Sequence, residues 1–357
     1  MPAIHQLVAG FSLGDAISNE ATVMRDVFRS WGYDSDIWCE TRRVLPRLRA
    51  QARDLAGLPA VCRPDDIVFL HLSIGSPVNL LFPTLPGRKA LLYHNITPPE
   101  YFTIMQPVTA QLLAKGRAQA RALAGTAAVR LADSRYNADE LEAMGHGRTD
   151  VLPLILDYER LRLPPDRRTL AQYDDGRTNI LFVGRCAPNK KLEDVLTAFA
   201  CSQRGVDPRA RLLLAGSFAG TELYQRLLAG MATEMGLKSV VFTDAIPQSE
   251  LNACYRAAHV FVCMSEHEGF CIPLIEAMVH RVPVLAYAAA AVPETLAGAG
   301  VLFADKNFET IAEMMARLAR PGALREGVLA RQDARLKQLI GRDLAAELRQ
   351  HLAPLLK

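Results

Sequence analysis

Three basic residues at the end of a predicted strand have the types and spacing to bind a phosphate. A strand predicted over 179–183 is followed by Arg185, and the next predicted helix would carry Lys190 and Lys191 in its first turn. The N-terminus of a helix carries partial positive charge, which disfavours cations and favours anions there. A bound phosphate would explain these residues, with Arg185 as a planar fork and Lys190 as a point charge. The alternative is that the acidic pair at 193–194 neutralises the lysines.

Two glutamates eight residues apart stand beyond another predicted strand. Glu268 precedes a short loop, and Glu276 falls one turn into a helix predicted to open near Pro273. Free backbone N–H groups at such a helix start can cradle an oxyanion or hydroxyls. Each carboxylate can accept two hydrogen bonds, which suits a polyhydroxyl ligand. The alternative, complementation of the helix dipole, accounts for Glu276 better than for Glu268. The loop that would line this site is Gly269, Phe270, Cys271 and Ile272.

Three segments of the first half of the chain are weaker candidates. His94 follows the predicted strand 90–93; a lone histidine is more often structural, but ligands bind at the ends of parallel strands. The loop Gly10–Gly14 lacks the GxGxxG spacing of a dinucleotide site, yet it would let a backbone approach a phosphate. Asp34 and Asp36 have the spacing of a metal-binding pair, but they precede a strand, so we reject them as ligands.

Short apolar runs alternate with helical patterns along the whole chain. Such runs are typical of parallel strands covered on both faces, so the sequence predicts an α/β protein of two doubly wound, Rossmann-like domains. Pro164-Pro165 and the polar stretch after it mark the boundary. We expect domains over 1–165 and 166–340, and a C-terminal helix within 341–357 that could pack back on the first domain. The predicted strands are 3–9, 36–39, 67–72, 90–93, 127–132, 179–183, 211–215, 240–243, 260–263, 284–286 and 300–303.

Length and composition exclude several classes of protein. With 357 residues, 50% hydrophobic and 22% charged, the chain is an ordinary globular protein of about two domains. A net charge of +3 is too small to indicate nucleic-acid binding. No apolar run approaches the roughly 18–20 residues of a bilayer span, and no basic leader opens the sequence. The seven cysteines form no CxxC pair; we interpret them as small hydrophobes in a reducing cytoplasm, neither disulfides nor zinc ligands.

The combination of these motifs resembles retaining glycosyltransferase family 4 (group 1), which has the GT-B fold. Glu268-x7-Glu276 resembles the family's EX7E motif, and Gly184-Arg185-x4-Lys190 resembles its phosphate-binding Arg and Lys. The segment Tyr93–Pro98 resembles a first-domain motif of bacterial members that build surface polysaccharides. The resemblance spans nearly the whole chain in the right order. It implies two Rossmann-like domains facing a central cleft.

The resemblance also implies a role for each matched charged residue. Arg185 and Lys190 would neutralise the donor diphosphate and the charge that develops on the leaving group. Lys191 competes with Lys190 for that place. Glu276 would hold the ribose hydroxyls of the nucleotide, and Glu268 would hold sugar hydroxyls.

Further donor contacts are implied around these residues. The backbone 269–272 would cradle sugar and phosphate, and His94 would contact the donor sugar near the reacting carbon. The loop ending at Gly14 would approach the phosphates, and Ile246 falls where family members often touch the base. No cofactor or metal is expected, because in this family protein cations usually stand in for the metal.

The implied activity is transfer of a hexose from a GDP- or UDP-hexose to an acceptor hydroxyl with retained anomeric configuration; mannose from GDP-mannose is our guess. The acceptor would be a lipid-linked or other saccharide of lipopolysaccharide or exopolysaccharide biosynthesis, in the cytoplasm. The basic cluster Arg42–Arg53 hints at peripheral contact with an anionic inner membrane, although a solvated helix face is the simpler explanation. Two alternatives stay open: another GT-B enzyme, such as a sugar-nucleotide epimerase or a phosphorylase, and a non-catalytic nucleotide-sugar-binding subunit.

Overall fold

The chain folds into two compact units in the computed structural model, which describes residues 2–356. Unit 1 comprises residues 2–103, 107–157 and 343–356, and unit 2 comprises residues 104–106 and 158–342. No helix in the described residues is long and apolar enough to cross a bilayer.

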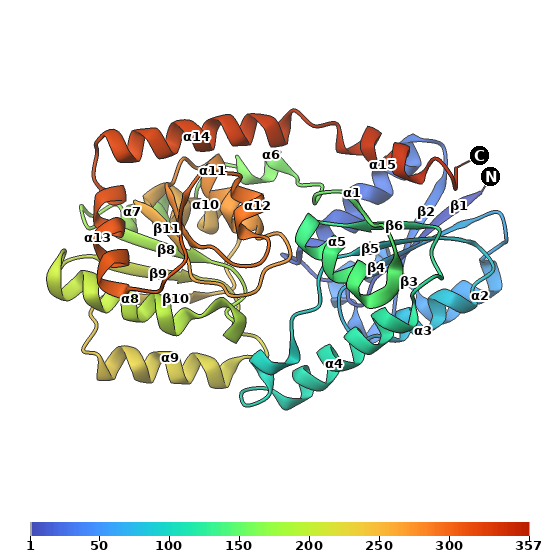
Figure 1. Ribbon diagram of the computed structural model, residues 1–357, viewed down its shortest axis with the longest axis horizontal. Coiled ribbons are helices and arrows are strands. Elements are labelled where there is room, and N and C mark those ends of the chain that lie inside the picture. The colour runs from blue at the N-terminus through green and yellow to red at the C-terminus, as the bar shows by residue number, and fades with distance from the viewer. Residues whose placement is uncertain (1, 357) are drawn as a thin grey trace. The chain divides into compact units, whose positions relative to one another are not determined.

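Unit 1 is built on a seven-stranded parallel sheet (Figure 1) with the order β3-β2-β1-β4-β5-β6-β7. Its strands are β1 (Ala3–Leu7), β2 (Asp34–Cys39), β3 (Arg53–Asp54), β4 (Ile67–Leu72), β5 (Arg88–Tyr93), β6 (Val129–Ala132) and β7 (Asp150–Val151). Its helices are α1 (Ala16–Ser30), α2 (Leu58–Val61), α3 (Pro77–Leu81), α4 (Pro107–Ala122), α5 (Arg135–Leu141) and α15 (Leu344–Leu352). Short helical turns are η1 (Thr41–Arg43), η2 (Pro46–Gln51), η3 (Leu55–Gly57), η4 (Phe82–Thr84), η5 (Pro99–Phe102) and η6 (Glu142–His146).

The C-terminal helix α15 is part of the unit 1 core. Leu348 and Leu352 are fully buried and pack in one cluster with Ile4 of β1, Phe69 of β4 and Leu92 of β5. Burying a leucine side chain contributes about 1.5–3 kcal/mol. The last helix therefore closes a face of the first sheet, although it is the most distant element in sequence.

Unit 2 is built on a six-stranded parallel sheet with the order β10-β9-β8-β11-β12-β13. Its strands are β8 (Asn179–Val183), β9 (Arg211–Ala215), β10 (Val240–Asp244), β11 (Val260–Cys263), β12 (Val284–Tyr287) and β13 (Val301–Phe303). Its helices are α6 (Tyr158–Leu161), α7 (Arg167–Tyr173), η7 (Pro188–Lys190), α8 (Leu192–Gly205), α9 (Glu222–Glu234), α10 (Gln248–Ala257), α11 (Ile272–Val279), α12 (Val292–Leu296), α13 (Phe308–Ala319) and α14 (Ala323–Ile340).

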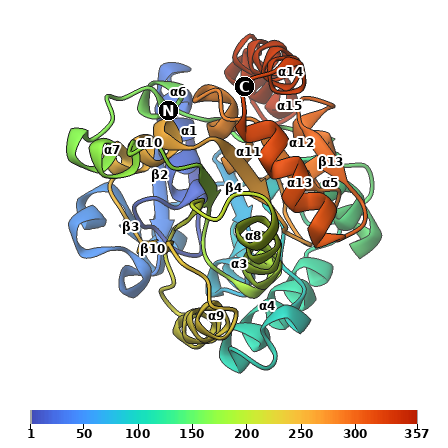
Figure 2. The same ribbon diagram turned by 90° about the vertical axis from the view of Figure 1, so that its left-hand side faces the viewer.

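Helices cover both faces of the unit 2 sheet, which explains its continuous apolar strands. Ile180 and Phe182 of β8 pack with α8, α9 and α13, whereas Leu181 and Val183 pack with α10, α11 and α12. Alternate residues of a strand point to opposite faces, so each must be apolar when both faces are covered. Figure 2 shows α8 and α13 side by side on the first of these faces.

The proline-rich stretch that we expected to separate two domains belongs to unit 2. Asn252 Nδ2 of α10 donates to the Leu163 carbonyl at 2.9 Å, and the Asp166 N–H donates to the Ser249 carbonyl at 2.8 Å. The division between the units falls after Asp157, before that stretch.

Candidate functional site

The ends of β8 and β11 lie at the point where the strand order of the unit 2 sheet reverses. Ligands bind open α/β sheets at such switch points, beyond the carboxyl ends of the strands. The loop after β8 carries Arg185 and Lys190, and the loop after β11 carries Glu268. Lys190 Nζ donates to Glu268 Oε2 at 2.5 Å, so the fold brings together two predicted residues that are 78 positions apart.

Lys190 and Lys191 lie ahead of the helix, whereas the sequence had suggested its first turn. Lys190 ends η7, and Lys191 takes a left-handed φ of 52° as the N-cap of α8. Lys191 Nζ lies 3.5 Å from a carboxylate oxygen of Glu193, as the neutralisation alternative requires for that lysine. Lys190 turns to Glu268 instead, which favours Lys190 over Lys191 as the cation of the site.

The contact with Glu268 keeps Lys190 charged in a buried position. Burial lowers the pKa of Lys190, but the Glu268 carboxylate and the adjacent Cys271 and Cys263 together raise it above its ordinary value. The side chains of Lys190 and Glu268 are only 19% and 9% exposed. Removing one partner of such a pair leaves an uncompensated charge and costs about 3–5 kcal/mol.

The loop that carries Glu268 is fixed by hydrogen bonds at both ends. Asn189 Nδ2 donates to the His267 carbonyl at 2.9 Å, and the Thr295 hydroxyl donates to the Phe270 carbonyl at 2.5 Å. Cys271 then takes a left-handed φ of 69° as the N-cap of α11. The four predicted loop residues Gly269, Phe270, Cys271 and Ile272 thus lead directly into the N-terminus of α11.

Glu276 is held by a tyrosine that sequence reasoning missed. Tyr255 Oη of α10 donates to Glu276 Oε2 at 2.7 Å, and the tyrosine ring stacks on His280 with centroids 5.0 Å apart. Burial raises the pKa of Glu276, and the hydrogen bond from Tyr255 opposes that rise. A helical tyrosine carries no motif, so only the fold reveals this partner.

Arg185 and Ile246 lie at the same edge of the sheet without joining the cluster. Arg185 is exposed directly beyond β8, and no carboxylate among the described residues forms an ion pair with it. Ile246 follows β10 and is partly buried against the core cluster that α10 and α11 share.

His94 of unit 1 is part of a chain of buried hydrogen bonds at the carboxyl end of β5. Gln6 Nε2 donates to the Ala21 carbonyl at 3.0 Å, which turns Gln6 Oε1 towards His71 Nε2 at 3.1 Å. His71 therefore donates with Nε2 and accepts with Nδ1, from His94 Nε2 at 2.9 Å. His94 Nδ1 faces an Asp133 carboxylate oxygen at 3.2 Å. Because both of its ring nitrogens donate, the partners assign His94 as an imidazolium.

Two buried carboxyl groups balance this imidazolium. Burial lowers the pKa of His94, but Asp133 and Glu20, whose carboxylate oxygen lies 3.6 Å from Nδ1, outweigh burial and raise it to about 8. Burial raises the pKa of Glu20 to about 8 as well. Burial also lowers the pKa of His71 well below its usual value. At neutral pH the His94 imidazolium therefore faces a Glu20 carboxyl group that burial keeps largely protonated; burial raises the pKa of Asp133 too, and His94 opposes that rise.

The partners of His94 were not recognised in the sequence. These partners have no common spacing, since they come from β1, α1, β4 and the loop after β6: Gln6, Glu20, His71 and Asp133. The His94 side chain is 2% exposed and both of its nitrogens are occupied within unit 1. A hydrogen bond from this ring to a sugar would have to displace one of those partners.

The glycine loop of unit 1 has no comparable cluster. Gly14 has a φ of 72°, and a Cβ there would meet no heavy atom within 4 Å. Asp15, which follows it, caps α1 by accepting the Ser18 N–H at 2.8 Å. The loop therefore lies at the N-terminus of α1, beyond the end of β1.

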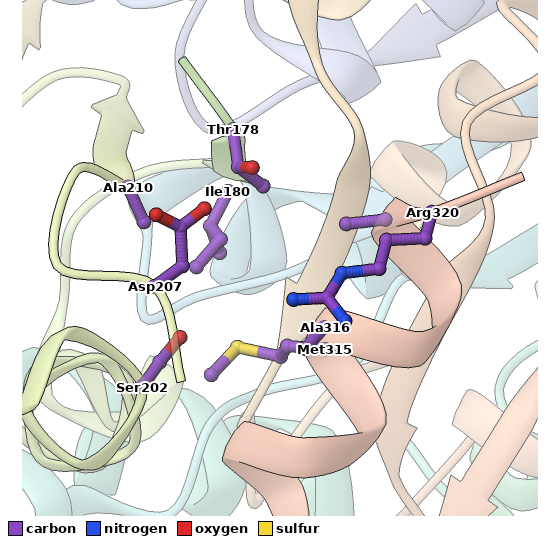
Figure 3. Close-up of a pocket in the computed structure, with 9 residues that line it drawn as sticks. Thr178, Ile180, Ser202, Asp207, Ala210, Met315, Ala316 and Arg320 are labelled. Atoms are coloured by element: carbon purple, nitrogen blue, oxygen red, sulfur yellow. The ribbon is translucent and has the colours of Figure 1, made fainter. Parts of the chain in front are cut away.

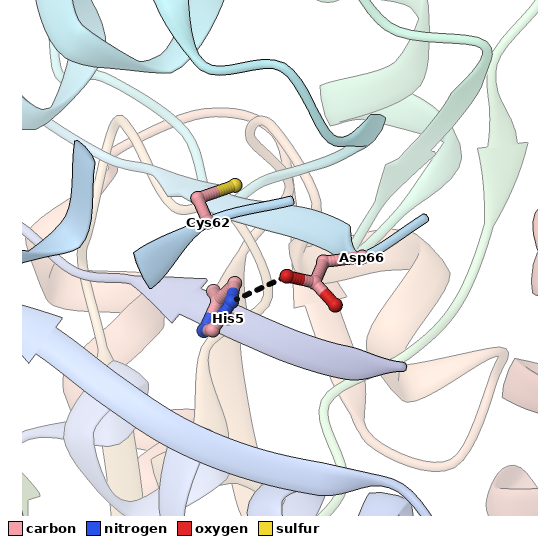
Figure 4. Close-up of side chains that lie close together, drawn as sticks. All are labelled: His5, Cys62 and Asp66. Carbon is pink, nitrogen blue, oxygen red and sulfur yellow. Dashed lines mark hydrogen bonds and ion pairs between the residues drawn. The ribbon is translucent and has the colours of Figure 1, made fainter. Parts of the chain in front are cut away.

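Two other features have purely structural explanations. His5, Cys62 and Asp66 lie close together (Figure 4). Trp38 donates to His5 Nδ1 at 3.2 Å, so His5 Nε2 donates to Asp66 at 3.3 Å, and both ring nitrogens are occupied.

The pocket between Ser202, Asp207 and Arg320 (Figure 3) encloses about 20 Å³, room for about one water, at the amino ends of β8 and β9.

Comparison with known proteins finds a matching family model within unit 2. Residues 168–328 match the family model of glycosyl transferases group 1. A D-inositol 3-phosphate glycosyltransferase of Frankia alni is 32% identical over 199 residues, 53% of this chain and 49% of that protein. The O-antigen chain mannosyltransferase B of Escherichia coli is 29% identical over 161 residues, 44% and 41% of the two chains. A GDP-mannose:cellobiosyl-diphosphopolyprenol alpha-mannosyltransferase of Xanthomonas oryzae is 38% identical over 104 residues, 29% and 26%. The chain thus spans half or less of the length of these curated relatives.

A solved structure matches over the full length. HepE of Anabaena, crystallised in complex with UDP and glucose, has a TM-score of 0.71 and 15% identity, with 99% of both chains covered. The predicted GT-B architecture of two parallel, Rossmann-like sheets is confirmed. Residues 168–328, within unit 2, thus match the group 1 glycosyltransferases, the family that the motifs of the sequence resemble.

Proposed function

We propose that this chain is a retaining hexosyltransferase that moves a hexose from a nucleotide sugar to an acceptor hydroxyl. The contact of Lys190 with Glu268 at the switch point of unit 2 is the observation that carries the proposal. A buried ammonium held by an exchangeable carboxylate suits an anionic ligand, because a pyrophosphate can take the place of Glu268. Glu268, once released, accepts hydrogen bonds from sugar hydroxyls, and Glu276 accepts them from the ribose.

The proposed reaction breaks the bond from the anomeric carbon to the phosphate oxygen and forms a bond to the acceptor oxygen on the same face. The acceptor proton passes to the leaving phosphate oxygen. Arg185 and Lys190 stabilise the negative charge that develops on that phosphate, which is the part of the reaction that fixed cations accelerate most. Glu268 serves as a binding group and not as a nucleophile. We propose that His94 contacts the donor sugar near the reacting carbon.

The donor and pathway that we propose follow the relatives. A mannosyltransferase of O-antigen chains and a GDP-mannose-dependent enzyme acting on a diphosphopolyprenol-linked sugar both match this chain. We therefore propose GDP-mannose as donor, and a lipid-linked saccharide of lipopolysaccharide or exopolysaccharide assembly as acceptor. UDP-hexoses are the competing donors, since HepE was solved with UDP and glucose.

The acceptor would bind in a groove of unit 1. A hollow of about 490 Å³ opens beside the carboxyl ends of β2 and β3. It is lined by Glu40, Thr41, Arg42, Asp54, Leu55, Ala56, Pro59, Pro77 and Leu81. Nearby, Arg42 and Arg43 pair with Glu40, and Arg53 pairs with Asp36. This pairing leaves few basic groups of the 42–53 cluster for an anionic membrane, so we propose at most weak peripheral contact, which vesicles with and without anionic lipid would reveal.

Donor binding by calorimetry tests the site with a matched pair of variants. Lys190→Met should weaken GDP-mannose binding at least about 100-fold, because it removes a buried charge-assisted contact. Lys191→Met changes the neighbouring lysine, whose carboxylate partners are Glu193 and Glu266, and should leave the affinity within about threefold. Equal effects of the two substitutions would contradict the site. Tight donor binding without transfer to any saccharide acceptor would favour the non-catalytic alternative.

A further inference from the structure

Two cysteines and a glutamate of unit 2 converge on one point. Cys263 ends β11 and Cys271 is the N-cap of α11, and each offers a sulfur that lies within 4.8 Å of the other and of a Glu268 carboxylate oxygen. All three residues are buried. From the spacing of the cysteines we had interpreted them as separate small hydrophobes, and the fold places this pair together.

This set of atoms has the chemistry of a zinc site. Zinc prefers thiolates, imidazoles and carboxylates in a tetrahedron, with zinc–sulfur distances of about 2.3 Å, so two sulfurs on one ion lie roughly 3.8 Å apart. The three ligand atoms here need to move by about 1 Å or less to reach that geometry. Their carrier segments are the end of a strand and the start of a helix, with the intervening loop fixed by Asn189 and Thr295.

The charges of the site also balance around a divalent ion. Two thiolates and the Glu268 carboxylate carry three negative charges, and the ion and the adjacent Lys190 ammonium carry three positive charges. Metal binding must release the protons of both thiols.

The other two clusters of this kind in the described residues lack these properties. His5 and Asp66 already use their polar atoms on Trp38, on backbone N–H groups and on each other. His71 and His94 are joined to each other through their ring nitrogens. In the third cluster Glu268 is paired with Lys190, but the hydrogen bond of the Cys263 sulfur to the Ser265 hydroxyl, at 3.3 Å, is weak.

We propose that Cys263, Cys271 and Glu268 form a binding site for one thiophilic divalent cation of the Zn²⁺ type. The ion competes with Lys190 for Glu268. While the ion holds Glu268, this carboxylate cannot accept hydrogen bonds from the donor sugar, so donor binding is weakened. This effect on donor binding rests on the proposed function, whereas the binding of the ion does not.

Titration of the reduced full-length chain with Co²⁺ tests the site by its colour. We expect one equivalent to give a sulfur-to-cobalt charge-transfer band and the visible bands of a tetrahedral ion, both removed by Zn²⁺. Cys271→Gly should weaken binding by more than about 100-fold, since even changes outside the ligand set cost 10–100-fold. Glycine suits the left-handed φ of 69° at this position, so the variant should keep its fold. Cys254→Ser, a buried thiol of α10, is the matched control and should bind as the wild type does.

Two outcomes would overturn the site. One is a cobalt spectrum without the sulfur band, and the other is a spectrum that survives in both Cys271→Gly and Cys263→Ser. Inhibition is measured separately: Zn²⁺ should lower GDP-mannose affinity at least about tenfold in the wild type, with full recovery by chelator, and should not do so in Cys271→Gly. Cobalt binding without this inhibition would refute the competition. If the chain with chelator bound no nucleotide sugar, the proposed function would fail, and the spectrum would still decide the metal site.

Discussion

Tyr255→Phe is the sharpest test of how the hydrogen bond from Tyr255 keeps Glu276 ionised for donor binding. The substitution removes one oxygen atom, which donates to Glu276 Oε2 at 2.7 Å. The ring remains and can keep its stack on His280. Tyr255 is 1% exposed, so water does not replace the lost hydroxyl without rearrangement. The change therefore isolates a single hydrogen bond to a carboxyl group that burial already disfavours in its charged form.

The expected loss of stability follows from the negative charge of the Glu276 carboxylate, which accepts the hydrogen bond. A hydrogen bond to a charged group contributes about 1.5–3 kcal/mol, and we expect Tyr255→Phe to lower the free energy of unfolding by that amount near neutral pH. A loss of about 1.4 kcal/mol on the ionised form raises the pKa of Glu276 by about one further unit. In the proposed role Glu276 accepts two ribose hydroxyls, so a larger protonated fraction should weaken nucleotide-sugar binding at acid pH, by up to about tenfold for a pKa raised by one unit. The deficit should shrink as the pH rises and the carboxyl group ionises.

Tyr224→Phe provides the matched control. Tyr224 is also buried in unit 2, and its hydroxyl donates to a carboxylate, that of Glu193. Both variants should lose stability in chemical denaturation, but only Tyr255→Phe should change donor affinity and its pH dependence in calorimetry. If the two variants bound the donor equally well at every pH, Glu276 would not be the ribose ligand. If Tyr255→Phe bound weakly but without pH dependence, the account based on ionisation would be wrong.

Four further substitutions probe the scaffold. Gly216→Ala should destabilise the chain by more than about 2 kcal/mol in thermal unfolding, because its Cβ would lie 1.9 Å from the Gly184 carbonyl oxygen. Gly230→Ala is the control: a Cβ at this position of α9 meets no heavy atom within 4 Å, and the variant should be more stable by up to about 1 kcal/mol. Leu348→Ala should cost about 2–5 kcal/mol, since α15 contributes to the unit 1 core; a normal melting curve would contradict that packing. Glu20 and His94 bind protons more tightly folded than unfolded, so the stability that they contribute is present at acid pH and is lost as the pH rises through about 8. The melting temperature should therefore fall from pH 7 to pH 9, and Glu20→Gln should flatten that fall.

The fold could be predicted because burial on both faces of a sheet leaves a clear trace in the sequence. In β8 the buried Asn179 is followed by four apolar residues, 180–183, and this apolar run is visible without alignment. The strands β3 and β7 were missed because each has two residues and no apolar run. The start of α8 was predicted too early, since nothing in the sequence marks Lys191 as left-handed.

The candidate site could be predicted only as separate motifs. Glu268 and Lys190 each stood out because a charged residue beyond a buried strand is unusual, and the fold then placed them in contact. Tyr255 and the partners of His94 did not stand out, because their function as hydrogen-bond donors and acceptors depends on neighbours from distant elements. The same holds for Cys263 and Cys271, whose spacing fits no metal motif.

In each unit a buried cation is paired with a carboxylate of the chain itself in the absence of ligand. An unpaired ammonium or imidazolium away from water costs several kcal/mol, so Lys190 takes Glu268 as partner and His94 takes Asp133. The pyrophosphate of the donor must therefore replace Glu268 as the partner of Lys190. The contact contributes to donor affinity only the difference in free energy between the Lys190–pyrophosphate and the Lys190–Glu268 interactions. A site of this kind binds anions that bring two or more charges and rejects single carboxylates, which offer no gain over Glu268. On this argument a nucleoside diphosphate should bind far more tightly than the corresponding nucleoside monophosphate, and similar affinities for the two would show that Lys190 does not exchange its partner.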